Sequence, residues 1–210
     1  MRGTRVSSGI VPATRVSEPD VAAIVLAGGA SRRFGRDKLA EPIAGRAMLD
    51  HVIERVRPVA VDIVVVGSVR PTLDVPADVE VVNDDRPFEG PLAGLVVGLR
   101  ALDPGVERVL VVGGDMPTLV PAVLDRLIDA LDRREAAVLS DATRPRPLPM
   151  AVRRSKAIDV VEGLLDDGER RLRTILERLD VQVIPDDVWR SDDPDGQTLR
   201  DVDVPEDLPG

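Results

Sequence analysis

The stretch VAAIVLAGGASRRFGRDK, residues 21–38, indicates both the fold of this chain and its first ligand site. Its first six residues are apolar and predict a buried parallel strand. The adjacent glycines Gly28 and Gly29 let the backbone turn sharply and approach a ligand, because neither carries a Cβ atom. Four cationic side chains follow within seven positions, namely Arg32, Arg33, Arg36 and Lys38. Bare backbone N–H groups beside clustered positive charge suit a chain of phosphates.

Two well-known phosphate motifs do not describe this loop. A Walker A loop needs Gly-Lys-Ser/Thr where this chain has Gly-Arg-Asp-Lys at residues 35–38. The loop also lacks the Gly-x-Gly-x-x-Gly fingerprint of dinucleotide-binding folds. The alternative to a phosphate site is an ordinary strand-to-helix turn with solvated arginines.

The composition limits the class of protein. At 210 residues the chain fits one large α/β domain. With two Phe, one Trp and no Tyr, the core must be built from aliphatic side chains, which suits a parallel sheet. The absence of cysteine excludes disulfides and thiolate metal sites and agrees with a cytoplasmic location. The net charge of −9 argues against a nucleic-acid-binding surface, and the apolar runs are too short to predict a membrane span.

Strand-like and helix-like patterns alternate through residues 21–139. Strand patterns cover residues 22–26, 61–66, 79–82, 108–112 and 136–139. Helical faces are formed by apolar residues within 48–56, 92–99 and 120–131. This alternation predicts a single-domain, Rossmann-like, three-layer α/β/α fold with a mostly parallel, doubly wound sheet. Ligands are then expected at the carboxyl ends of the strands.

The ends of the chain are less regular. Residues 1–20 are expected to form a disordered N-terminal extension to a domain spanning 21–210. Residues 148–152, entered through three prolines, predict an edge or antiparallel strand. Beyond it we expect helices at 158–165 and 172–179, a strand at 181–184 and an acidic loop at 186–196.

Asp115 is the candidate metal ligand. It follows the apolar run Val109–Val112 and two glycines, and is therefore expected at the carboxyl end of a strand, facing the ligand crevice. Mg²⁺ prefers hard carboxylate oxygens held beside substrate phosphates. The alternative is an ordinary turn or cap before Pro117.

Residues 83–94 join a predicted strand to a predicted helix. Gly90 permits a close backbone approach, and the N-terminus of the helix favours negative charge. Asp84 can accept hydrogen bonds from a base or a ribose, or it can cap a turn, and both interpretations stay open. His51 lies between apolar positions of a predicted helix, which favours a structural role over a catalytic one.

Together these motifs resemble the molybdenum cofactor guanylyltransferases of the MobA type. The resemblance covers about residues 21–208. It rests on the segments LAGG (26–29), RDK (36–38), GPLAG (90–94), GDMP (114–117), GERR (168–171) and DVDVPEDL (201–208). The first four are shared by many nucleotidyltransferases, whereas the double glycine and the last two favour the guanylyl branch.

The resemblance implies transfer of GMP from GTP to the phosphate of molybdopterin, with release of pyrophosphate. It implies catalytic roles for Lys38, Asp115 and Arg32, and Asp115 as the ligand of Mg²⁺, or of Mn²⁺ in its place. The implied nucleotide-binding residues are Leu26, Ala27, Gly28, Gly29, Lys38, Asp84, Gly90 and Asp115. On the acceptor side, Arg170 and Arg171 are expected to attract the phosphate, and Asp201 and Asp203 to face the ring.

The chain departs from the family pattern at three positions. Gly67 stands where the family often has Asn, and Asp201 and Asp203 replace two further Asn residues. Asp203 has the alternative role of capping a helix at 205–207. The open alternatives are a nucleotidyltransferase with another base or acceptor, such as a cytidylyltransferase or a phospholactate guanylyltransferase, and a non-catalytic nucleotide-binding regulator. We expect a monomer or weak homo-oligomer that makes transient contacts with other molybdenum cofactor proteins.

Overall fold

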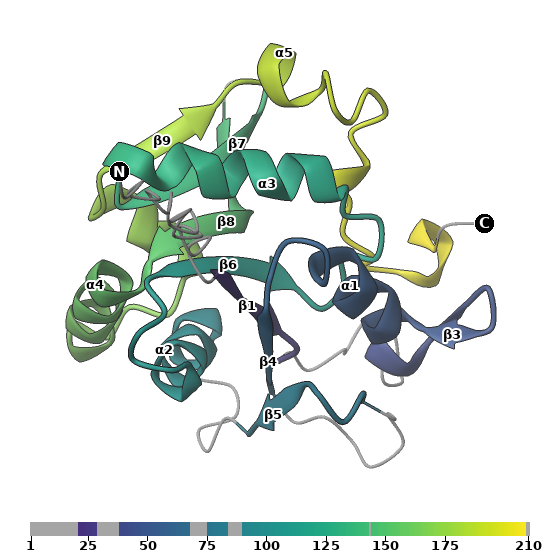
Figure 1. Ribbon diagram of the computed structural model, residues 1–210, viewed down its shortest axis with the longest axis horizontal. Coiled ribbons are helices and arrows are strands. Elements are labelled where there is room, and N and C mark those ends of the chain that lie inside the picture. The colour runs from purple at the N-terminus through teal and green to yellow at the C-terminus, as the bar shows by residue number, and fades with distance from the viewer. Residues whose placement is uncertain (1–20, 29–37, 68–74, 84–89, 143, 209–210) are drawn as a thin grey trace, which may run out of the picture.

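The computed structural model describes residues 21–28, 38–67, 75–83, 90–142 and 144–208 (Figure 1). Within these residues the main sheet has seven strands, in the spatial order β5 (Glu80–Val82), β4 (Asp62–Val66), β1 (Val21–Leu26), β6 (Arg108–Gly113), β8 (Arg144–Arg153), β7 (Ala136–Asp141) and β9 (Val181–Ile184). All of them run in one direction except β8, which is antiparallel to both of its neighbours. The predicted mostly parallel sheet is confirmed. The predicted extension, residues 1–20, lies outside the described residues.

Helices cover both faces of this sheet (Figure 1). The long helices are α1 (Met48–Val56), α2 (Pro91–Ala101), α3 (Pro121–Asp129) and α4 (Arg154–Asp166). Strand β1 shows how the layers form, since Ala23 and Val25 join the core under α1 and α3, while Ala22 and Ile24 join the core under α2 and α4. Both faces of the strand are buried, which explains its continuous apolar sequence. The three-layer α/β/α prediction is therefore confirmed.

Strand β8 lies inside the sheet, between β6 and β7, and the sequence-based option of an edge strand is wrong. Val138 stands opposite Met150, but Ser140 stands opposite Pro145. Residues 146–149 therefore face a single residue of β7, and the ladder is interrupted there. A bulge leaves backbone groups out of the ladder, so prolines, which have no N–H to donate, are tolerated at this point.

The region after β9 also differs from the prediction. The expected loop at 186–196 contains a short helix, α5 (Asp186–Trp189), and Trp189 is fully buried with its Nε1–H donating to the Ser140 carbonyl oxygen at 2.9 Å. The helix expected at 172–179 is the shorter 3₁₀ helix η3 (Leu172–Glu177). A two-stranded hairpin, β2 (Pro42–Ile43) and β3 (Arg46–Ala47), has too few residues for a periodic signal. None of the helices described is both long and apolar enough to cross a membrane.

The carboxyl ends of the parallel strands form the edge on which the candidate site lies. Leu26, Val66 and Gly113 end three adjacent strands and are aligned in register. Backbone bonding continues beyond these ends, because the Ala27 N–H donates to the Val66 oxygen at 2.8 Å and the Gly114 N–H donates to the Leu26 oxygen at 2.9 Å. The start of the glycine-rich loop is thus held by both neighbouring strands.

Candidate active site

Lys38, Asp115 and Asp203 meet at the carboxyl edge of the sheet. The Lys38 ammonium donates to Asp115 Oδ2 at 2.7 Å and lies 3.7 Å from Asp203 Oδ1. The Lys38 side chain is 15% exposed, against 30% for Asp115 and 54% for Asp203. The exposed fraction of the side chain therefore increases from Lys38 through Asp115 to Asp203, which borders the solvent.

Each of the three residues is fixed by its neighbours. Lys38 begins the 3₁₀ helix η1 (Lys38–Ala40), whose Leu39 side chain is buried in the core under α1 and α3. A Cβ atom on Gly113 would lie 2.5 Å from Asp115 Oδ1, so the glycine leaves room for the Asp115 carboxylate. The Val202 N–H donates to the Asp115 carbonyl oxygen at 2.9 Å, which ties the C-terminal segment to the end of β6.

The capping role considered for Asp203 belongs to Asp207. The last 3₁₀ helix, η5 (Pro205–Asp207), has Val204 as its N-cap residue. Asp207 Oδ2 accepts hydrogen bonds from the backbone N–H groups of Asp203 and Val204, each at 3.0 Å. Asp207 thus holds the backbone from which Asp203 reaches Lys38. Sequence reasoning missed Asp207, although an acidic residue at the third helical position is a known capping signal.

Gly28 and Gly67 are glycines for different reasons. Gly67 has a φ of +146°, and a Cβ atom there would lie 2.7 Å from the Ala27 carbonyl carbon and 2.8 Å from the Gly28 nitrogen. Packing of backbone against backbone therefore excludes any side chain at 67, including the Asn expected from the family pattern. Among the residues that the structure describes, no atom lies within 4 Å of a Cβ atom built on Gly28. Gly28 is exposed, so its backbone is open to a ligand.

Gly90 is the N-cap residue of α2 and has a φ of +93°. A Cβ atom on it would lie 2.8 Å from the Arg170 carbonyl oxygen and 3.1 Å from the Arg170 Cβ atom. The close approach expected at Gly90 is thus made by another part of this chain. This contact brings the segment 168–171 beside the N-terminus of α2.

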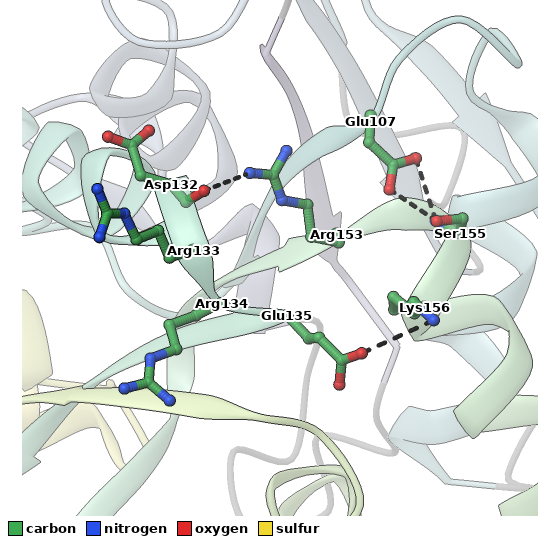
Figure 2. A pocket seen from close by; sticks show the side chains of 8 residues that line it. All are labelled: Glu107, Asp132, Arg133, Arg134, Glu135, Arg153, Ser155 and Lys156. Atoms are coloured by element: carbon green, nitrogen blue, oxygen red, sulfur yellow. Dashed lines mark hydrogen bonds and ion pairs between the residues drawn. The ribbon is translucent and has the colours of Figure 1, made fainter.

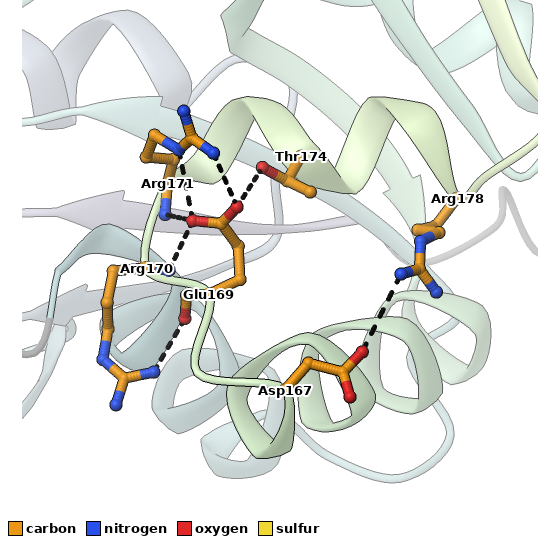
Figure 3. A network of polar contacts seen from close by, with 6 residues as sticks. All are labelled: Asp167, Glu169, Arg170, Arg171, Thr174 and Arg178. Carbon is orange, nitrogen blue, oxygen red and sulfur yellow. Dashed lines mark hydrogen bonds and ion pairs between the residues drawn. The ribbon is translucent and has the colours of Figure 1, made fainter.

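The segment Gly168–Arg171, called the arginine turn below, is organised by Glu169 (Figure 3). The Arg171 guanidinium, the N–H groups of Arg171 and Arg170, and the Thr174 hydroxyl all donate to this carboxylate and hold the pKa of Glu169 well below its usual range. Arg171 is therefore half of an ion pair, with 3.0 Å between its Nη2 and Glu169 Oε2. The Arg170 guanidinium donates to carbonyl oxygens, which do not cancel its charge.

The predicted acceptor residues occupy three different positions. Asp203 lies with Lys38 and Asp115, whereas Arg170 and Arg171 lie beside the N-terminus of α2. Asp201 is exposed at the surface. Gly29, Arg32 and Asp84 lie outside the described residues.

A second depression lies at the opposite edge of the sheet (Figure 2). It has a volume of about 370 Å³ and is lined by residues that precede β6 and β7 and by residues that end or follow β8. Its polar groups bond to one another, since the Ser155 hydroxyl donates to Glu107 at 2.7 Å and Lys156 lies 3.8 Å from Glu135. Glu107 also accepts the Ser155 N–H at 3.3 Å, so this carboxylate caps the first turn of α4. These contacts indicate a structural role.

The carboxylates at the candidate site suit a hard cation. The part of the chain that the structure describes holds no group of three or more His, Cys, Asp or Glu side chains arranged for a metal ion. Mg²⁺, however, is commonly held by one or two carboxylates together with substrate phosphates. Asp115 and Asp203 offer two such carboxylates, and both approach the Lys38 ammonium.

Comparison with known proteins finds a matching family and similar sequences over most of the chain. The family model described as the MobA-like NTP transferase domain matches residues 23–183. A "Probable molybdenum cofactor guanylyltransferase" from Chloroflexus aggregans is 31% identical over 191 residues, which cover 88% of this chain and 90% of that protein. A molybdenum cofactor guanylyltransferase from Rhizobium meliloti is 36% identical over 165 residues, which cover 74% of each chain.

Solved structures show the same fold. Molybdopterin-guanine dinucleotide biosynthesis protein A from Archaeoglobus fulgidus superposes with a TM-score of 0.74 and 26% identity, covering 89% of this chain and 94% of that one. A 4-diphosphocytidyl-2C-methyl-D-erythritol synthase from Anaerococcus prevotii gives a TM-score of 0.69 at 17% identity over 90% and 94% of the two chains, a likeness of fold alone. The predicted family is confirmed: this chain belongs to the MobA-like NTP transferase family.

Proposed function

We propose that this chain transfers GMP from GTP to the phosphate of molybdopterin and releases pyrophosphate. The meeting of the Lys38 ammonium with the Asp115 and Asp203 carboxylates, at the strand ends beside the glycine-rich loop, is the observation that carries this proposal. The names of the relatives support the choice of guanine and of the molybdenum cofactor.

The reaction needs positioning and positive charge more than it needs a base. An oxygen of the acceptor phosphate bonds to the α-phosphorus of GTP, and the bond from that phosphorus to the bridging oxygen of the leaving pyrophosphate breaks. The second pKa of a phosphomonoester is about 6, so the attacking oxygen is already ionised near neutral pH. Negative charge then develops on the leaving pyrophosphate, where a preorganised cation is most effective.

Lys38 and the two carboxylates supply these requirements. The buried side chain of the adjacent Leu39 anchors Lys38, and its ammonium pairs with Asp115. The Lys38 ammonium is therefore already in place before the substrate binds. Asp115 and Asp203 are the residues that would hold Mg²⁺, which neutralises phosphate charge when bound. The open backbone at Gly28 is where we place the approaching nucleotide.

Product analysis tests the proposal. The purified chain is incubated with Mg²⁺, either GTP or CTP, and either molybdopterin or another phosphorylated acceptor, and the products are identified by mass spectrometry. We expect a guanine dinucleotide and pyrophosphate from GTP and molybdopterin. Faster transfer from CTP would overturn the base assignment, and transfer only to another acceptor would overturn molybdopterin. Nucleotide binding without any transfer would point to a regulator instead.

A further inference from the structure

One carboxylate, that of Glu169, fixes the whole arginine turn. Glu169 Oε1 accepts the N–H of Arg170 at 2.8 Å, the N–H of Arg171 at 3.0 Å and the Arg171 Nε–H at 3.2 Å. Glu169 Oε2 accepts the Arg171 Nη2–H and the Thr174 hydroxyl, each at 3.0 Å (Figure 3). Five donors thus converge on a group with about four lone-pair sites, so its acceptor capacity is fully used.

The other side of the turn rests on α2. The carbonyl oxygen and Cβ atom of Arg170 occupy the space that a side chain on Gly90 would need. The turn, held together by the Glu169 carboxylate, therefore packs against Gly90, the N-cap residue of α2, at the carboxyl edge of the sheet. Gly90 directly follows the segment 84–89, which contains Asp84, a nucleotide contact that the family resemblance implies.

The two arginines differ in the charge they can offer. The charge of Arg171 is matched by Glu169. The Arg170 guanidinium is steadied by the carbonyl oxygens of Glu169 at 2.8 Å and Leu165 at 3.4 Å, and keeps its positive charge. Arg170 is therefore the better partner for an incoming anion, and Arg171 belongs to the framework of the turn.

We infer that Glu169 is a positioning residue, whose carboxylate holds the arginine turn so that Arg170 binds the anionic phosphate of the acceptor. The inference rests on the proposed transfer reaction and assigns different tasks to the three adjacent residues Glu169, Arg170 and Arg171. Without the carboxylate, the two backbone N–H groups and the Thr174 hydroxyl lose their common acceptor. The backbone of Arg170, from which its side chain extends, is then no longer held in place.

Steady-state kinetics on matched variants test the inference. Glu169→Ala and Arg170→Ala should each raise the KM for the acceptor about tenfold or more, the effect of losing a hydrogen bond to a charged group. The kcat and the affinity for GTP should stay within about twofold. The double variant should be little worse than either single one, because both act through the same contact. Glu169→Gln should be milder than Glu169→Ala, since its amide oxygen still accepts the backbone N–H groups.

Asp167→Asn is the control, because Asp167 lies two residues earlier, is 70% exposed and pairs only loosely with Arg178, at 3.8 Å. It should leave every kinetic constant unchanged. Equal losses in GTP and acceptor binding by Glu169→Ala would reduce Glu169 to a purely structural residue. An unchanged acceptor KM in Arg170→Ala would show that the turn does not bind the acceptor.

A separate measurement distinguishes this inference from the proposed function. Calorimetry with inorganic phosphate should show binding to the wild type and to Asp167→Asn, and clearly weaker binding to Arg170→Ala and Glu169→Ala. If molybdopterin yields no product but this ranking holds, the acceptor assignment fails and the inference stands. If phosphate binds all four proteins equally, the inference is overturned whatever the acceptor proves to be.

Discussion

Alanine at Gly67 should destabilise the fold, while alanine at Gly28 should weaken nucleotide binding. At Gly67 the new methyl group would lie 2.7–2.8 Å from backbone atoms of residues 27 and 28, and the φ of +146° is rarely adopted by other residues. Backbone strain of this kind costs about 1–3 kcal/mol. Forced overpacking costs about 1–3 kcal/mol more. For a domain of this size, Tm should fall by at least about 4 °C.

At Gly28 the same change meets open space within the described part of the chain, where no atom lies within 4 Å of the added carbon. Tm should therefore stay within about 2 °C of the wild type, because the change adds no clash to the folded chain. The affinity for GTP should fall about tenfold or more, because the methyl group would stand where the backbone is open to phosphate.

Thermal denaturation and calorimetry with GTP separate the two effects. Gly163→Ala is the control, because Gly163 lies in α4 and no atom of the described residues is within 4 Å of an added carbon. It should raise stability by up to about 1 kcal/mol, the difference in helix propensity between the two residues. An unchanged Tm in Gly67→Ala would refute the packing argument, and unchanged GTP affinity in Gly28→Ala would refute the placement of the nucleotide.

Three further changes probe the site and its supports. Asp115→Asn should keep Tm and much of the GTP affinity but lose most turnover and its Mg²⁺ dependence, whereas Asp129→Asn, at the far end of α3, should match the wild type in kinetic assays. Asp207→Ala should lower stability by about 1 kcal/mol in urea unfolding and also slow transfer, since Asp207 holds the backbone of Asp203. The pKa of Glu169 is lowered in the folded chain, so its stabilisation is present above the unfolded pKa of about 4.3 and is lost as pH falls below it. The difference in unfolding free energy between wild type and Glu169→Gln should therefore shrink between about pH 5 and pH 3; a constant difference would contradict the assigned contacts.

The sequence predicted the central fold because the signals there are local and strong. Aliphatic runs such as Val21–Leu26 are buried on both faces, and Pro91 and Pro121 stand at the first positions of α2 and α3. Strand β8 was harder to place, since its prolines indicate an edge strand unless the bulge that accommodates them is known. Helix α5 was missed because four residues, two of them Asp, carry no helical period.

In the candidate site too, residues in local motifs could be predicted, whereas contacts that depend on the folding of distant segments could not. Lys38 and Asp115 could be predicted because each belongs to a short motif that follows an apolar strand. The contact between Asp203 and Lys38 could not, because it depends on how the C-terminal segment folds back against Asp115. Glu169 and Asp207 were missed for a related reason, since the N–H groups that a carboxylate accepts depend on local backbone geometry.

The fate of the α-phosphate of GTP tests the central claim most directly. GTP labelled at the α-phosphorus is incubated with molybdopterin and Mg²⁺, and the label is followed in single-turnover reactions of the wild type, Lys38→Ala and Asp115→Asn. We predict that the wild type moves the label into the acceptor product and releases unlabelled pyrophosphate. Lys38→Ala should bind GTP but transfer the label far more slowly, and Asp115→Asn should transfer little. Label that reaches the acceptor at the wild-type rate in both variants would contradict the assignment of this site to the reaction.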